Sequence, residues 1–165
     1  MALTYKLIEA KTLASAAASV TFSSIPQTYT DIKFVLSLRS ATADTRDSIA
    51  IKPNNSTSNL TYRYIRGDGS SVSSNTLDRV DIDAANATAS TFGNLEIYIP
   101  NYASANYKSF SIDTVTENNA TETYSGLHAW LWSDTTAISS MVFSNLSAAN
   151  FVQYSTFYLY GIKNS

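Results

Sequence analysis

The sequence predicts an all-β protein, folded as a single-domain antiparallel β-sandwich of the jelly-roll type over residues 1–165. Charged residues make up only 15% of the chain, below the ~25% typical of globular proteins. Ser, Thr and Asn are abundant instead, and these residues favour turns and strand surfaces over helices. Eleven Tyr and seven Phe fit pleated, half-buried surfaces. Short alternating segments separated by turn residues then predict about eight to ten strands.

The first third of the chain contains the most regular alternation of apolar and polar residues. Residues 31–39 place Ile32, Phe34, Leu36 and Leu38 on one face, which is the period of a half-buried strand. Residues 14–18 have helix propensity, but the segment is too short to form a stable helix alone. Strands are expected at residues 5–10, 19–22, 31–39, 48–52 and 60–65.

Residues 67–89 are rich in Gly, Ser, Asn and Asp, so this region is the least determined by pattern. Asp68-Gly69 follows the strand at 60–65 and is a hairpin-turn signal. A short strand is expected at residues 79–82. Beyond this region, alternation predicts strands at 92–99, 107–115 and 127–132, the last with His128, Trp130 and Trp132 on one face.

The end of the sequence is unusually apolar for a chain terminus. Residues 138–146 and 156–162 predict two final strands, and both faces of the last strand are largely apolar. Such a segment must be held in a sheet, so we expect residues 156–162 to lie inside a sheet or against a neighbouring subunit. Residues 19–25 resemble residues 140–146, which suits a sandwich whose two ends pair within one sheet, although a Ser-rich composition also produces such matches by chance.

Composition also excludes several classes of function. The chain has no Cys and one His, so disulfides, thiolate metal sites and sites built from two imidazoles are excluded. Net charge is −2 without a basic run, which argues against nucleic-acid binding. No apolar run approaches the ~20 residues that span a bilayer, and no basic segment followed by an apolar core suggests a secretory signal. We therefore expect no cofactor, no nucleic acid and no membrane partner.

Two groups of polar residues are candidate chemical sites. His128 is the only imidazole that could act as a base, but no nucleophile-elbow pattern accompanies it, so we expect neither catalytic residues nor an enzyme. Asp78, Asp81 and Asp83 cluster downstream of Asp68. Their spacing matches no EF-hand loop, so we interpret them as turn carboxylates and expect no metal site.

Trp130 and Trp132 are the candidate carbohydrate platform. Two indoles on one strand face can stack against pyranose rings if they are exposed. The competing interpretation is that they fill the core, since large aromatic side chains are mostly buried. We favour the core.

Four segments of the chain resemble small virion proteins of tailed bacteriophages of the marine and cyanobacterial type. These segments are Tyr5-Lys6-Leu7-Ile8, Val20-Thr21-Phe22-Ser23-Ser24-Ile25-Pro26, Leu95-Glu96-Ile97-Tyr98-Ile99-Pro100-Asn101-Tyr102 and Phe157-Tyr158-Leu159-Tyr160-Gly161-Ile162. The closing Leu-Tyr-Gly-Ile is the most recognisable of them. The resemblance carries no catalytic motif.

This resemblance implies a β-sandwich structural protein of the virion. The first role it suggests is a capsid decoration, or cement, protein that binds the assembled shell and stabilises it. Its partners would be the major capsid protein and two further copies of itself in a homotrimer, at the capsid surface rather than the tail. The alternatives are a tail-fibre, adaptor or receptor-binding tip protein, or a carbohydrate-binding module with a glycan as ligand.

Overall fold

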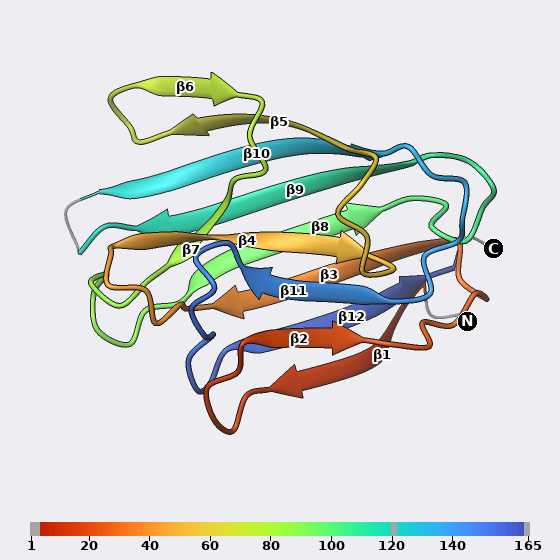
Figure 1. Ribbon diagram of the computed structural model, residues 1–165, viewed down its shortest axis with the longest axis horizontal. Helices are drawn as coiled ribbons and strands as arrows, with labels where there is room; N and C mark the ends of the chain where they lie inside the picture. The colour runs from red at the N-terminus through yellow and green to blue at the C-terminus, as the bar shows by residue number, and fades with distance from the viewer. Residues whose placement is uncertain (1–3, 120–121, 164–165) are drawn as a thin grey trace.

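The computed structural model describes residues 4–119 and 122–163, and it confirms the all-β prediction. Two antiparallel sheets, one of eight strands and one of four, pack face to face as a sandwich (Figure 1). The described residues form twelve strands, more than the about eight to ten that alternation predicts. None of them forms a helix long and apolar enough to cross a bilayer.

The larger sheet has the strand order β1-β12-β3-β8-β9-β10-β5-β6. Its strands are β1 (Tyr5–Thr12), β3 (Asp31–Leu38), β5 (Leu60–Gly67), β6 (Val72–Asn75), β8 (Gly93–Ile99), β9 (Lys108–Glu117), β10 (Thr123–Trp132) and β12 (Thr156–Ile162). Side chains alternate between the two faces of each strand. One face packs on the smaller sheet, and the other faces outward.

The smaller sheet has the strand order β2-β11-β4-β7. Its strands are β2 (Ser19–Phe22), β4 (Arg46–Pro53), β7 (Val80–Asp83) and β11 (Met141–Asn145). The two segments that resemble each other in sequence are neighbours here, because β2 pairs antiparallel with β11 and places Met141 opposite Phe22. The predicted pairing of the two ends of the chain is therefore confirmed twice, since β1 also pairs with β12.

The closing strand β12 lies between β1 and β3, inside the larger sheet as predicted. Phe157, Leu159 and Gly161 point into the core, whereas Tyr158 and Tyr160 are half-buried on the opposite face. A strand with partners on both sides has all its backbone groups paired, which explains how an apolar terminus is held in place.

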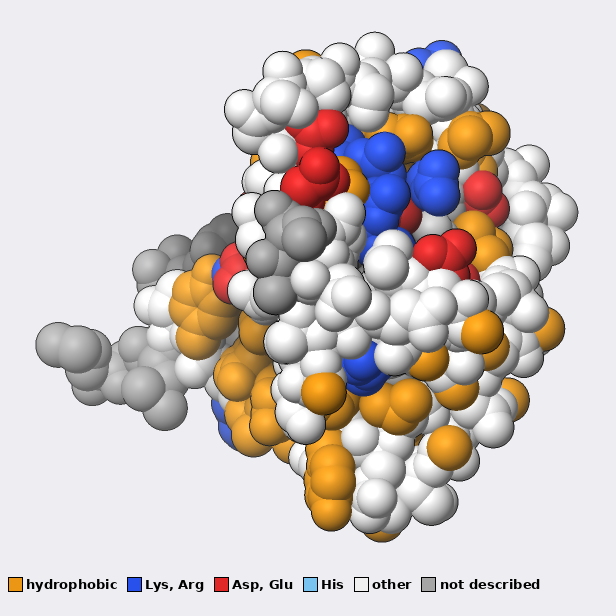
Figure 2. All heavy atoms as spheres, turned by 90° about the vertical axis from the view of Figure 1, so that its left-hand side faces the viewer, with side chains coloured by type: hydrophobic (Ala, Val, Ile, Leu, Met, Phe, Trp, Pro, Cys, Tyr) orange, Lys and Arg blue, Asp and Glu red, His pale blue; other side chains and the backbone are white. Residues whose placement is uncertain are grey.

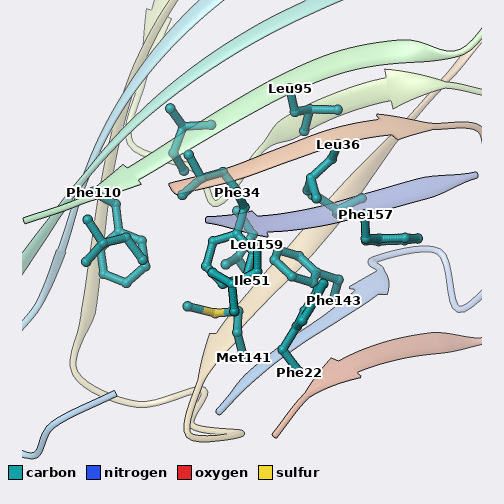
Figure 3. Packing of buried hydrophobic residues seen from close by; sticks show 14 of the residues in the cluster. Phe22, Phe34, Leu36, Ile51, Leu95, Phe110, Met141, Phe143, Phe157 and Leu159 are labelled. Carbon is teal, nitrogen blue, oxygen red and sulfur yellow. The ribbon is translucent and has the colours of Figure 1, made fainter. Parts of the chain in front are cut away.

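The core lies between the two sheets and is centred on aromatic side chains (Figure 3). Phe22 and Phe143 from the smaller sheet meet Phe34 from the larger sheet, with ring centroids 5.3 Å apart for Phe34–Phe143 and 5.4 Å for Phe22–Phe34. Both pairs are edge-on, the arrangement that aromatic quadrupoles prefer. All three rings are fully buried, so this contact joins the two layers of the sandwich.

Candidate functional site

The outward face of the larger sheet is the most extensive surface without a covering layer in the described structure. Most strands that build it expose every second side chain to solvent, as β9 does with the pattern of alternating buried and exposed residues from Lys108 to Glu117. A sheet in a sandwich normally presents polar residues on this face. Here several large apolar side chains are exposed instead: Tyr5, Leu7, Ile65, Val72, Tyr98, Val115, Leu127 and Leu131.

Four of these side chains gather into what we call the outer patch: Ile65, Val72, Val115 and Leu127. Ile65 on β5 lies directly opposite Leu127 on β10, and all four line one depression on the sheet surface. Leu127 is 60% exposed and Val72 is 76% exposed. Contiguous exposed apolar surface of this kind marks interaction sites.

A second depression on the same face extends the outer patch along β5 and β10. Its floor includes Ile65, Leu127 and Ala129, and charged side chains of opposite sign, Arg63 and Asp113, stand at its borders. Apolar floors with a polar rim are the usual anatomy of protein interfaces. The arrangement therefore supports binding to another protein surface.

The interpretation of the clustered aspartates as turn carboxylates is wrong for Asp81 and Asp83, because both lie in strand β7 and are buried. Asp68 accepts hydrogen bonds from the backbone N–H groups of Ser71 and Ser70, which lower the pKa of its carboxyl group. Asp83 accepts the N–H of Glu117 at 3.0 Å. The expectation that Asp68 belongs to a turn is confirmed, since Gly69 adopts φ +86° in the β5–β6 hairpin.

Asp81 differs from the other aspartates because three arginines surround its carboxylate. Arg46 and Arg66 reach its Oδ2 at 3.1 and 2.8 Å. Among the described residues, no group of three or more His, Asp or Glu side chains is arranged to hold a metal ion. The spacing of the aspartates pointed to this region, but nothing in the sequence pointed to the arginines.

His128 faces the interior of the sandwich, next to the ring of Tyr64 at 5.6 Å between centroids. Its Nε2 lies 3.5 Å from Thr114 Oγ1, and its buried Nδ1 has no hydrogen-bond partner among the described residues. A histidine base in a nucleophilic site is oriented by a third group on the other nitrogen. Burial lowers the pKa of His128 to about 4, so the imidazole is neutral near pH 7.

Trp130 and Trp132 also point inward, 3% and 1% exposed. Trp130 packs edge-on against Tyr62 at 4.5 Å between ring centroids, and the Lys108 ammonium lies 5.6 Å from the ring centroid of Trp132. Neither indole presents a flat exposed face to a sugar ring. The structure therefore places both tryptophans in the core, which is the interpretation favoured from the sequence.

No protein-family model matches this sequence, and no curated protein matches it at a significant level. The candidate site is therefore assigned from the geometry of the structure. Sequence reasoning missed the outer patch, because Val72 lies in a segment without alternation and because exposed and buried apolar residues look alike in a sequence.

Proposed function

We propose that this chain is a structural protein of a tailed-phage virion, a capsid decoration protein that binds the assembled shell and stabilises it. The observation that carries the proposal is the outer patch on an uncovered sheet face, where Leu127 and Ile65 are 60% and 54% exposed. An apolar patch on a rigid sheet is suited to docking against a fixed protein lattice. The four sequence segments that resemble phage virion proteins supply the context.

The strand order supports a jelly-roll topology for the sandwich. Setting aside the hairpins β5–β6 and β9–β10 leaves four strands in the order β1-β12-β3-β8 facing four in the order β2-β11-β4-β7. The chain then crosses from one sheet to the other at every step except from β4 to β7, which both lie in the smaller sheet. This is the connectivity of two interleaved Greek keys, the jelly roll of many viral capsid domains. The two hairpins extend one sheet, and the outer patch lies on this extension.

Stabilisation would follow from mass action. A protein that binds the assembled shell but not its free subunits lowers the free energy of the assembled state. A homotrimer would match the threefold and quasi-threefold positions of an icosahedral lattice through heterologous contacts. The partner in this proposal is the major capsid protein, and the location is the capsid surface.

Co-sedimentation of the purified protein with shells of the phage that encodes it tests this proposal. We expect the wild-type protein to pellet with the shells. Leu127→Lys should reduce the affinity for the shells at least tenfold, because docking would bury the lysine charge in the interface, and burying a charge is costly. Leu146→Lys is the matched control, since Leu146 is also exposed, at 46%, but lies outside the outer patch. Failure of the wild-type protein to pellet, or equal binding by Leu127→Lys, would contradict the proposal.

A further inference from the structure

Three arginines surround Asp81 at one end of the sandwich, the end that carries the β5–β6 and β9–β10 turns. Arg46 comes from β4 in the smaller sheet and Arg66 from β5 in the larger sheet, and Arg79 precedes β7. Arg79 Nε lies 3.2 Å from Asp81 Oδ1. Basic side chains gather in a hollow at this end, with acidic side chains around it (Figure 2). We call Arg46, Arg66, Arg79 and Asp81 the arginine cluster.

The hydrogen-bonding capacity of Asp81 is already used. Its Oδ2 faces the Nη1 atoms of Arg46 and Arg66, and its Oδ1 faces Arg79 Nε and accepts the hydroxyl of Ser48 at 2.9 Å. A carboxylate offers about four acceptor positions. Each guanidinium carries five N–H donors, so most donors of the three arginines must find an acceptor other than Asp81.

Two of the guanidinium groups are held in place by an aromatic ring. The centroid of the Tyr124 ring lies 4.0 Å from Arg46 Cζ and 5.3 Å from Arg66 Cζ. Arg46 Nε is buried and has no hydrogen-bond partner in the described structure. Preorganised guanidinium groups lose little conformational freedom when they bind a planar anion.

Charge counting favours an anion with a single charge. Three arginines against Asp81 leave an excess of two positive charges. Glu122, which accepts the hydroxyl of Tyr124 at 2.6 Å at the border of the cluster, is one of the acidic side chains that lower this excess further (Figure 2). A carboxylate would neutralise the remainder and would match the fork of the guanidinium donors, whereas a doubly charged phosphate would overcompensate it.

We propose that the arginine cluster is a binding site for the carboxylate of an acidic side chain on a partner protein. Arg46 and Arg66 have side-chain exposures of 20% and 21%, and Arg79 of 46%, so an incoming carboxylate can reach all three. That the partner is the capsid shell rests on the proposed function. The anion site itself does not.

The first test uses the isolated protein and sodium acetate as the probe. Acetate should raise the melting temperature by about 3 °C over sodium chloride of equal ionic strength, because a ligand of the native state stabilises it. Arg66→Gln should abolish the rise. Arg63→Gln should keep it, since Arg63 lies on the same strand but lines the opposite sheet face. Arg79→Gln is a second cluster variant. Because Arg79 is the most exposed member of the cluster, this variant still tests the site if Arg66→Gln misfolds.

The outcomes separate the alternatives. An equal acetate effect in wild type and in both cluster variants, or none at all, would overturn the site. A larger effect of inorganic phosphate than of acetate would overturn the assignment to a carboxylate.

The second test measures co-sedimentation with shells. We expect Arg66→Gln to bind them at least tenfold more weakly than wild type, whereas equal binding would overturn the role of the cluster in docking. If wild type itself fails to pellet, the proposed function fails, and the acetate result still decides the anion site.

Discussion

Replacing Gly161 by alanine should destabilise the protein, because the ring of Tyr29 occupies the space that a side chain would need. Gly161 lies in β12 and faces the core. An added Cβ would stand 2.4 Å from Tyr29 Cγ and 2.5 Å from its Cδ1. Ordinary carbon contacts are ~3.5–4.0 Å, so the ring or the strand must move by more than about 1 Å.

Neither can move freely. The strand is paired on both sides, with Gly161 opposite Lys6 in β1 and Ile32 in β3. The clash involves Cγ, near the base of the tyrosine ring rather than at its flexible end. Overpacking of this kind costs about 1–3 kcal/mol. Removing a glycine from the unfolded chain returns about 0.4–1 kcal/mol, so we expect a net loss of about 1–2 kcal/mol.

Urea unfolding of four proteins measures this effect: wild type, Gly161→Ala, Tyr29→Ala and the double variant. The two substitutions should be non-additive by about 1–2 kcal/mol, because the alanine methyl group clashes only while the ring is present. A Gly161→Ala protein as stable as wild type, or additive effects in the double variant, would refute the packing of Tyr29 on Gly161.

Three further substitutions test other parts of the fold. Burial holds the pKa of His128 at about 4 against an ordinary value of 6.5, so the unfolded chain binds a proton that the native state does not. The contribution of this group to the free energy of unfolding is therefore full above pH 6.5 and decreases as the pH falls, by about 2 kcal/mol at pH 5. Urea unfolding at a series of pH values should show a smaller loss of stability toward low pH in His128→Phe than in wild type. An equal loss in both proteins would contradict the prediction. Arg39→Ala should cost at least about 3 kcal/mol, because the Arg39 guanidinium donates to the carbonyls of residues 85, 87, 88 and 91; a loss below about 1 kcal/mol in urea unfolding would speak against those bonds. Phe143→Ala should cost about 3–5 kcal/mol, since its ring joins both sheets, and calorimetry showing a near-native melting temperature would exclude that role.

The core of the fold could be predicted from sequence wherever one face of a strand is buried. The alternation in residues 31–39 and the apolar run in 156–162 correspond to β3 and β12, the first ending one residue earlier than predicted and the second at the same bounds. Burial of one face imposes a period of two on the sequence, and this period is visible. Strand boundaries could not be predicted where polar residues continue a strand, as in Thr123–Gly126 of β10. Backbone pairing with β9 along this segment, and with β5 from Ser125 onward, holds such residues without an apolar signal.

The strand β6 shows the opposite case. All four of its residues are exposed, so no burial imposes alternation on them. Only the turn signal at Asp68-Gly69 indicated that a partner strand follows. Edge strands of this kind are defined by their backbone pairing with β5, and that pairing depends little on side-chain identity.

Much of the candidate site could not be predicted either, for a different physical reason. Arg46, Arg66 and Asp81 are far apart in sequence and come together only because β4, β5 and β7 converge at one end of the sandwich. The two tryptophans were predicted to share a face, and they do. Alternation gives the grouping of residues into faces, but it cannot give which face meets the second sheet.

The most direct test of the proposed function is to image virions of the phage that, under this proposal, encodes the chain, with and without the protein. The proposal predicts density over the capsid lattice that is present only with the protein, and heads that burst more readily in its absence. Density confined to the tail, with intact heads and failed adsorption when the protein is missing, would contradict it.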